Sequence, residues 1–176
     1  MIISKTEFIG VYVIDTEKIV DERGFFSRIW DEKKFKDKQL NTNWIQSSIS
    51  YNKASGTIRG MHFQNEPYQE IKMVRCVSGS IFDVIIDLRI SSSTYLQSFS
   101  IELNEENQKA IYIPKGFAHG FQTLQNDTVV LYNISEYYNP EYAKGIRWND
   151  PIINVKWPLN PSVISEKDKM YKNFLK

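Results

Sequence analysis

The chain has 176 residues, a mass of 20.7 kDa, a hydrophobic fraction of 41% and a formal net charge of +1. This length predicts a single domain over residues 1–176, and the balanced charge argues against a dedicated nucleic-acid binder. One cysteine excludes an internal disulfide framework, and the short apolar runs and the lack of a signal peptide predict a cytoplasmic protein without a membrane partner.

Short runs rich in Ile, Val, Tyr and Phe recur at intervals of about ten residues, with turn-forming residues between them. Each of these runs is predicted to be a strand. They cover residues 11–15, 24–30, 44–51, 57–64, 70–77, 80–88, 98–103, 109–113, 119–122, 128–134 and 145–148. Many short strands with this spacing predict an all-β antiparallel barrel or sandwich.

Alternation along residues 80–88 separates two faces of one predicted strand. One face carries Asp83 and Asp87 together with two isoleucines, and the other face is apolar throughout. The acidic face is expected to meet solvent or a polar cavity, and the apolar face is expected to meet the core. A barrel with a partly polar interior can hold a ligand.

The sequence predicts only two short helices. Residues 31–40 begin with an acidic pair and carry spaced apolar residues, which predicts a short surface helix. A tail helix is predicted over about residues 165–176, with Ser165 as the N-cap and Asp168 at the third helical position.

The two histidines are the first candidates for catalytic residues. His62 and His119 both lie in predicted strands close to glycine, where a ligand can approach the backbone. Strand parity places His62 on the opposite face from Arg59. A single strand histidine is more often a structural residue than a functional one. Where it is functional, general acid–base catalysis at neutral pH is favoured here.

A metal centre is the weaker alternative. The sequence contains neither a His-x-His motif nor a third histidine. A facial triad for iron would need His62 and His119 to converge, with Asp83 or Glu70 close by. We therefore expect no metal.

A histidine base needs a carboxylate that orients it and stabilises its charged form. Asp83, Asp87 and Asp168 are all candidates, and the residue pattern leaves the choice open.

Four further residues have two interpretations each. Lys72 lies in an apolar strand and points either to a solvent-exposed edge of the sheet or into a polar cavity. Tyr132 is either a packing residue or a phenol that faces a ligand. Arg23 and Arg59 each neighbour a glycine, a common but weak sign of an anion contact.

Nine segments taken together resemble the dTDP-4-dehydrorhamnose 3,5-epimerase family, a metal-free group with a cupin-type fold. In chain order they read DERGFF (21–26), IRGMHFQ (58–64), KMVRC (72–76), GSIFDV (79–84), IDLR (86–89), IPKGFAHGF (113–121), WNDP (148–151), VKWP (155–158) and SEKD (165–168). The resemblance implies a jelly-roll barrel with short peripheral helices, no cofactor, and a homodimer with exchanged N-terminal strands.

The resemblance also implies catalytic roles. His62 matches the base that removes a proton from the carbon next to a 4-keto group, and Asp168 matches its carboxylate partner. Lys72 matches the lysine that stabilises the enolate oxygen. Tyr132 matches the acid that returns a proton from the opposite face.

Six further residues match contacts to the substrate. Arg23 and Arg59 correspond to cations near the diphosphate, Phe26 and Tyr138 to aromatic rings around the nucleobase, Gln46 to the family's glutamine, and His119 to a second histidine near the sugar.

Some neighbouring positions depart from the family pattern. Ser47 and Ser48 stand where the family commonly has Asp-Asn, and Glu70 and Ile71 stand where it has Gln and a small residue. These departures leave the nucleotide base, the sugar and the reacting carbon open.

The implied activity is epimerisation at C3, C5 or both of a nucleotide-diphosphate 4-keto-6-deoxysugar through an enolate, in deoxysugar biosynthesis. The best single substrate is dTDP-4-keto-6-deoxy-D-glucose. The alternatives are a 3,4-ketoisomerase, a non-catalytic nucleotide-sugar-binding cupin, and a metal-dependent cupin oxygenase or isomerase. Since no glycine-rich nucleotide-cofactor loop is present in the sequence, a redox-neutral reaction is favoured.

Overall fold

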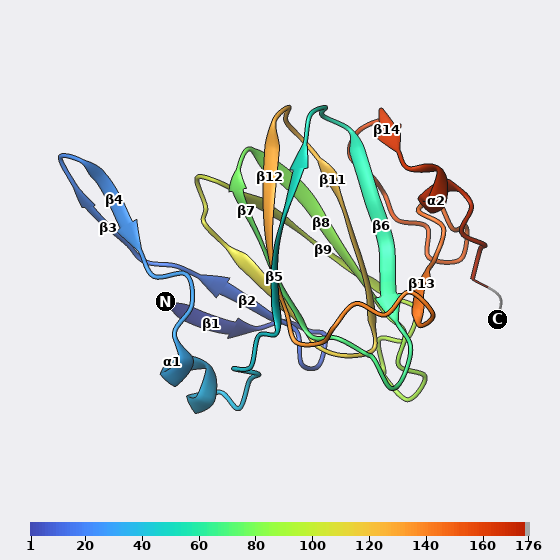
Figure 1. Ribbon diagram of the computed structural model, residues 1–176, viewed down its shortest axis with the longest axis horizontal. Coiled ribbons are helices and arrows are strands. Elements are labelled where there is room, and N and C mark those ends of the chain that lie inside the picture. Colours follow the sequence, from blue (N-terminus) through green and yellow to red (C-terminus); the bar gives the residue numbers. More distant parts are fainter. Residues whose placement is uncertain (175–176) are drawn as a thin grey trace.

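The computed structural model describes residues 1–174, and the chain folds almost entirely into strands (Figure 1). The strands are β1 (Ile2–Lys5), β2 (Tyr12–Asp15), β3 (Lys18–Asp21), β4 (Gly24–Ser27), β5 (Gln46–Asn52), β6 (Thr57–Gln64), β7 (Lys72–Ser78), β8 (Ser80–Asp87), β9 (Ser98–Asn104), β10 (Ala110–Ile113), β11 (Phe117–Thr123), β12 (Thr128–Ile134), β13 (Ala143–Gly145) and β14 (Val163–Ile164). The helices are α1 (Glu32–Asp37) and α2 (Glu166–Lys169).

Two sheets form the body of the protein. The first sheet has the order β1-β2-β10-β7-β12-β5, and the second has the order β13-β6-β11-β8-β9. Strand β14 adds to β6 in parallel, and the other strand pairs in the described chain are antiparallel. The sheets face one another (Figure 1). The predicted all-β jelly roll is therefore confirmed.

The interior between the sheets is apolar over much of its length. Val74 and Val130 of the first sheet pack with Ile85 and Phe121 of the second, and all four are almost fully buried. At the burial energy of about 25 cal/mol per Å² of apolar surface, such layers hold the two sheets together.

Strand β8 is buried on both faces, unlike a half-exposed strand. Ile81 and Ile85 lie between the sheets, whereas Val84 and Ile86 pack beneath the second sheet against a cluster that includes Ile153. Asp83 and Asp87, on the same face as Ile81 and Ile85, are both 0% exposed, so this face lies inside the protein and not in solvent.

Differences from the predicted elements occur mainly at the two ends of the chain. Strands β1, β3 and β14 were not predicted, residues 28–30 do not continue β4, and the strand predicted over 145–148 lies at Ala143–Gly145. Helix α1 is shorter than predicted, with Asp31 as the N-cap that accepts a hydrogen bond from the Lys34 N–H.

The tail helix predicted over about 165–176 is wrong beyond Lys169. Ser165 is the N-cap as predicted, and its hydroxyl accepts a hydrogen bond from the Asp168 N–H at 3.1 Å. The next residues leave the helix because tertiary contacts outweigh helix propensity: the Lys172 carbonyl accepts a hydrogen bond from the Arg147 N–H. Residues 175–176 lie outside the described chain.

The β3–β4 hairpin projects away from the barrel (Figure 1). Its apolar side chains are unusually exposed, with Ile19 at 68%, Val20 at 73%, Phe25 at 50% and Phe26 at 65%. No helix in the described part of the chain is long and apolar enough to cross a membrane.

Candidate active site

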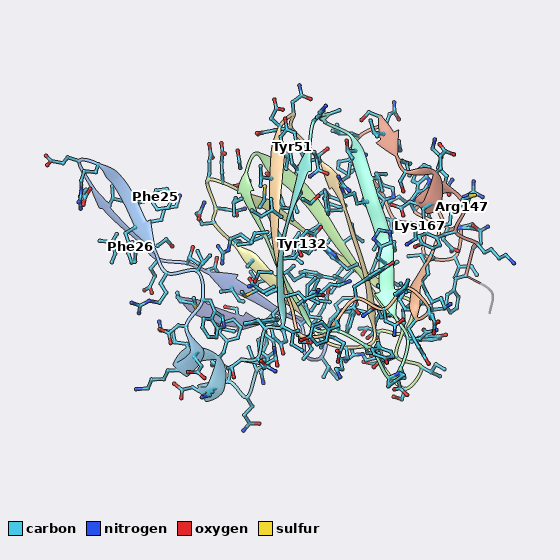
Figure 2. The ribbon with its side chains drawn as sticks, in the orientation of Figure 1. Phe25, Phe26, Tyr51, Tyr132, Arg147 and Lys167 are labelled. Carbon is cyan, nitrogen blue, oxygen red and sulfur yellow. The ribbon has the colours of Figure 1, made fainter. Side chains whose placement is uncertain are left out.

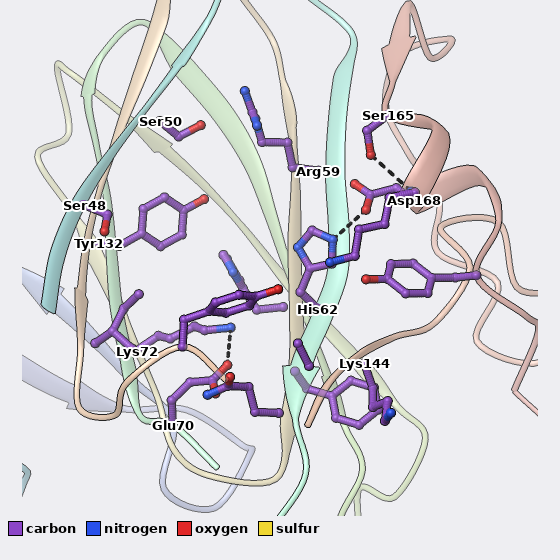
Figure 3. Close-up of a pocket in the computed structure, with 18 of the residues that line it drawn as sticks. Ser48, Ser50, Arg59, His62, Glu70, Lys72, Tyr132, Lys144, Ser165 and Asp168 are labelled. Carbon is purple, nitrogen blue, oxygen red and sulfur yellow. Dashed lines mark hydrogen bonds and ion pairs between the residues drawn. The ribbon is translucent and has the colours of Figure 1, made fainter. Parts of the chain in front are cut away.

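A pocket of about 590 Å³ opens between the two sheets, next to helix α2 (Figure 3). Eight of the ten predicted site residues line it. They are Gln46, Arg59, His62, Lys72, His119, Tyr132, Tyr138 and Asp168. Residues from opposite ends of the sequence therefore meet at one site.

His62 and Asp168 form a hydrogen-bonded pair. The Nε2 atom of His62 lies 2.7 Å from Oδ1 of Asp168, which leaves Nδ1 as the ring nitrogen free of that contact. The His62 side chain is 41% exposed toward the pocket, and the Asp168 side chain is 5% exposed. The carboxylate is thus shielded from water while the imidazole remains accessible.

Several donors keep Asp168 ionised. Burial alone would raise the pKa of this carboxyl group, but the hydrogen bond from His62, the charge that His62 carries when it is protonated, and the hydrogen bond from the Gly60 N–H lower the pKa below its ordinary value. Helix α2 supplies the position, because the Ser165 cap fixes the first turn that carries Asp168.

A β-bulge in β6 overturns the predicted parity of this strand. His62 pairs with His119 and Arg59 pairs with Phe121, so β6 uses one more residue than β11 between these two pairs. Arg59 and His62 consequently line the same pocket. Gly60 has a φ of +133°, and a Cβ atom there would collide with the backbone of Gly120.

Lys72 lies on the first sheet and forms an ion pair with Glu70. Its Nζ atom is 2.8 Å from Oε1 of Glu70, and the two side chains are 13% and 8% exposed (Figure 3). The second carboxylate oxygen of Glu70 is buried without a hydrogen-bond partner among residues 1–174. The lysine therefore faces the polar cavity and not a solvent-exposed edge of the sheet.

Tyr132 faces His62 from the opposite wall. It belongs to β12 of the first sheet, and its hydroxyl points into the pocket toward β6 of the second sheet (Figure 3). Burial, and secondarily the charge of Asp83, raise the pKa of Tyr132 well above its ordinary value, so the phenol stays protonated at neutral pH.

The second histidine has a carboxylate of its own. Nε2 of His119 lies 2.8 Å from Oδ2 of Asp83, and the ring of His119 meets Tyr132 edge-on at 6.0 Å. Asp87 instead accepts hydrogen bonds from Arg89, and so does not reach either histidine. Of the three candidate carboxylates, Asp168 therefore bonds His62, Asp83 bonds His119, and Asp87 bonds Arg89.

Cationic side chains surround the mouth of the pocket. Arg59 donates through Nε to Oδ1 of Asn52 at 2.7 Å, and Lys144 and Lys167 also line the pocket. The pKa of Lys167 lies above its ordinary value because Tyr171 lies beside its ammonium group. These cationic side chains make the pocket suited to an anion such as a diphosphate.

Arg23 and Phe26 lie outside the pocket of their own chain. Both are on the β3–β4 hairpin, where the Arg23 side chain is 85% exposed and bonded to Asp21. Figure 2 shows Phe25 and Phe26 far from Tyr132. Within one chain, these two predicted contacts are not brought to the site.

The two histidines lie in register, but each has its Nε2 atom bonded to a carboxylate. Across residues 1–174, no group of three His, Cys, Asp or Glu side chains is arranged to hold a metal ion. The pocket instead brings together an imidazole bonded to a carboxylate, a phenol on the opposite wall and an ammonium group. Such a set can move a proton at a carbon atom.

Sequence reasoning missed several residues of the pocket, notably Ser50, Lys144, Lys167 and Tyr171. Lys167 adjoins Asp168 inside the motif SEKD, so its position was available as a signal. Tyr171 belongs to no motif singled out in the sequence, and it follows the end of α2 at Lys169.

Comparison with known proteins identifies similar chains. A family model described as "dTDP-4-dehydrorhamnose 3,5-epimerase" matches residues 5–176. A curated protein of that name from Sinorhizobium fredii is 42% identical over 159 residues, which cover 90% of this chain and 82% of the relative. One from Methanothermobacter thermautotrophicus is 42% identical over 171 residues, covering 96% and 91%.

The chain is also similar to solved structures of 3,5-epimerases. The dTDP-4-dehydrorhamnose 3,5-epimerase of Bacillus anthracis, solved with TDP and PPi bound, has a TM-score of 0.95 and 34% identity, covering 98% of each chain. The 3,5-epimerase of Legionella pneumophila in complex with dTDP-4-keto-L-rhamnose has a TM-score of 0.91 and 33% identity, covering 97% of this chain and 91% of that chain.

Proposed function

The chain belongs to the dTDP-4-dehydrorhamnose 3,5-epimerase family, and we propose that it inverts C3, C5 or both of dTDP-4-keto-6-deoxy-D-glucose through an enolate. It is an isomerase of deoxysugar biosynthesis. The observation that carries the proposal is the His62–Asp168 pair on one wall of a pocket, with Tyr132 on the opposite wall.

His62 takes the proton. At pH 7 a neutral imidazole can accept a proton from a carbon next to the ketone. Nδ1 accepts this proton, because Nε2 is bonded to Asp168. The ionised carboxylate of Asp168 then stabilises the imidazolium that forms. The electron pair of the broken C–H bond moves into the carbonyl group, which becomes an enolate.

Lys72 stabilises the enolate oxygen. A proton next to a ketone is only weakly acidic, so its removal requires favourable electrostatics at the developing negative charge. The mostly buried ammonium of Lys72 provides this in a region where solvent screens little. Its ion pair with Glu70 holds the group at the edge of the cavity.

Tyr132 returns a proton from the other face. The phenol is neutral at pH 7, and the carbon of an enolate is basic enough to take its proton. Donation opposite to His62 inverts the stereocentre. The phenolate regains a proton from solvent and His62 loses one, so the reaction is balanced without a redox partner.

The remaining predicted residues bind the substrate. Arg59 holds the diphosphate, Gln46 and Tyr138 contact the nucleoside, and His119 lies near the sugar. The TDP of the Bacillus anthracis relative and the dTDP-sugar of the Legionella pneumophila relative support a thymidine diphosphate as the carrier.

A homodimer completes the site. The exposed apolar hairpin β3–β4 would seat Phe26 and Arg23 over the pocket of a partner, where they would contact the nucleobase and the diphosphate. Strands β1 and β2 pair within their own chain, and the exchange proposed here involves this hairpin. A cytoplasmic location stays a prediction from the sequence.

A substrate panel tests the proposal. The enzyme is offered dTDP-, CDP-, UDP- and GDP-linked 4-keto-6-deoxy-D-glucose, each coupled to a 4-reductase and NADPH, and the products are identified by NMR. We expect the dTDP sugar to be epimerised fastest. A 3-keto product would indicate a ketoisomerase, and binding without turnover would indicate a non-catalytic protein; either result contradicts the proposal.

A further inference from the structure

The segment that follows α2 brings an aromatic ring to His62. The ring centroid of Tyr171 lies 5.8 Å from that of His62, with the two planes 70° apart, and Tyr171 lines the pocket. The preceding residue, Met170, is 75% exposed. His62 is therefore contacted on two sides, by the carboxylate of Asp168 at Nε2 and by the ring of Tyr171.

Backbone contacts of the residues that follow Tyr171 hold this segment in place. The Arg147 N–H donates to the Lys172 carbonyl at 3.2 Å, and the Phe174 N–H donates to the carboxylate of Asp150. The Phe174 side chain packs against the cluster beneath the second sheet. The segment is thus held along β13 after the helix ends.

Strand β13 leaves room for the ring. Gly145 pairs with His62 across β13 and β6, and a Cβ atom on Gly145 would collide with the ring of Tyr171. The hydroxyl end of Tyr171 lies beside the Lys167 ammonium, and burial raises the pKa of the phenol. The ring therefore occupies a defined site as a neutral group.

We propose that Tyr171 is a positioning residue for His62, whose ring holds the imidazole with Nε2 on Asp168 and Nδ1 toward the substrate. This inference rests on the proposed function, in which His62 removes the proton. An imidazole fixed only by one hydrogen bond can rotate, and an edge-on aromatic neighbour restricts that rotation. The ring also shields the His62–Asp168 hydrogen bond from water, which strengthens it.

Two substitutions separate the ring from the hydroxyl. Tyr171→Phe keeps the ring, and Tyr171→Leu removes it while keeping an apolar side chain. We expect Tyr171→Leu to lower kcat for the dTDP sugar about tenfold with KM unchanged, and Tyr171→Phe to retain most of the activity. Met170→Leu, at the exposed neighbouring position, is the matched control and should leave kcat unchanged.

A kcat of Tyr171→Leu equal to that of the unsubstituted enzyme would overturn the inference. So would a raised KM with unchanged kcat, because the ring would then be a contact to the ligand. Thermal unfolding of each variant shows whether the fold is intact.

Proton NMR supplies a readout that does not depend on turnover. The chain has two histidines, and each bonds a carboxylate through Nε2, His62 to Asp168 at 2.7 Å and His119 to Asp83 at 2.8 Å. In Tyr171→Leu we expect the low-field His62 proton signal to broaden through exchange with water, while the His119 signal persists as the internal reference.

An unchanged His62 signal in Tyr171→Leu would contradict the inference even if activity fell. Absence of epimerisation by the unsubstituted enzyme would instead refute the proposed function, and the NMR spectra would still decide whether Tyr171 holds the His62–Asp168 bond.

Discussion

The carboxylate of Asp168 lies 2.7 Å from Nε2 of His62, although 106 positions of sequence separate the two residues. The contact joins a peripheral helix to a strand of the second sheet. The Asp168 carboxylate bonds the ring nitrogen of His62 that is not assigned to the substrate, so its loss should affect chemistry more than binding.

Asp168→Asn should lower kcat by roughly a hundredfold at pH 7 and leave KM nearly unchanged. The amide cannot stabilise the imidazolium, and it can favour the wrong tautomer of His62. Steady-state kinetics with the dTDP sugar measure both constants. A kcat within a factor of about two of the unsubstituted enzyme would show that the pair is only structural.

Lys72→Met should lower kcat roughly a hundredfold, since the enolate oxygen loses its cation. The same substitution leaves the Glu70 carboxylate buried without its ion-pair partner, so the protein should also become less stable. The double variant Lys72→Met, Glu70→Gln should recover stability and not activity. Urea unfolding and kinetics of the three proteins separate the two effects, and recovery of activity in the double variant would refute the role of Lys72.

Hybrid dimers test the exchange of the β3–β4 hairpin. His62→Ala removes the base from its own pocket, and Arg23→Ala removes a cation from the partner's pocket under the proposed exchange. Refolding the two variants together should create dimers with one intact site, and activity should exceed that of either variant alone. Activity equal to the average of the two separate proteins would show that each pocket uses the hairpin of its own chain.

Asp87 should make the fold sensitive to acid. Burial would raise the pKa of this carboxyl group, but hydrogen bonds from Arg89, Ser92 and Thr94 lower it to about 2, against 3.8 for the unperturbed group. The unfolded chain therefore binds more protons between these values, so stability is present above about pH 4 and is lost as the pH falls toward 2. The difference corresponds to about 2 kcal/mol.

Asp87→Asn should remove that pH dependence and lower the free energy of unfolding at pH 7 by about 2 kcal/mol. Urea unfolding at several pH values measures both effects. An unchanged slope of stability with pH below 4 would contradict the assignment.

Local patterns predicted much of the fold and of the site. Alternation in residues 80–88 separated Asp83 and Asp87 from the apolar face, and the spacing of Ser165 and Asp168 predicted the capped helix. The family resemblance then assigned Asp168 to His62, which the residue pattern alone had left open among three carboxylates. These features depend on neighbouring residues in the sequence or on a motif.

Other features depend on distant partners. The bulge in β6 arises where Gly60 packs against Gly120 of β11, and it turns Arg59 to the same pocket as His62 against the simple parity of the strand. Tyr171 leaves the predicted helical path because Lys172 bonds to Arg147. Neither contact can be recognised in the local sequence, since the partner residues, Gly120 for Gly60 and Arg147 for Lys172, lie far away along the chain.

The most direct test of proton transfer at carbon is turnover of dTDP-4-keto-6-deoxy-D-glucose in D2O, followed by NMR. The unsubstituted enzyme should introduce deuterium at C3, C5 or both, with inversion. Tyr132→Phe should introduce deuterium with little inversion, and His62→Ala should introduce none. Inverted product without deuterium at either carbon, or deuterium incorporation by His62→Ala at the full rate, would contradict the mechanism.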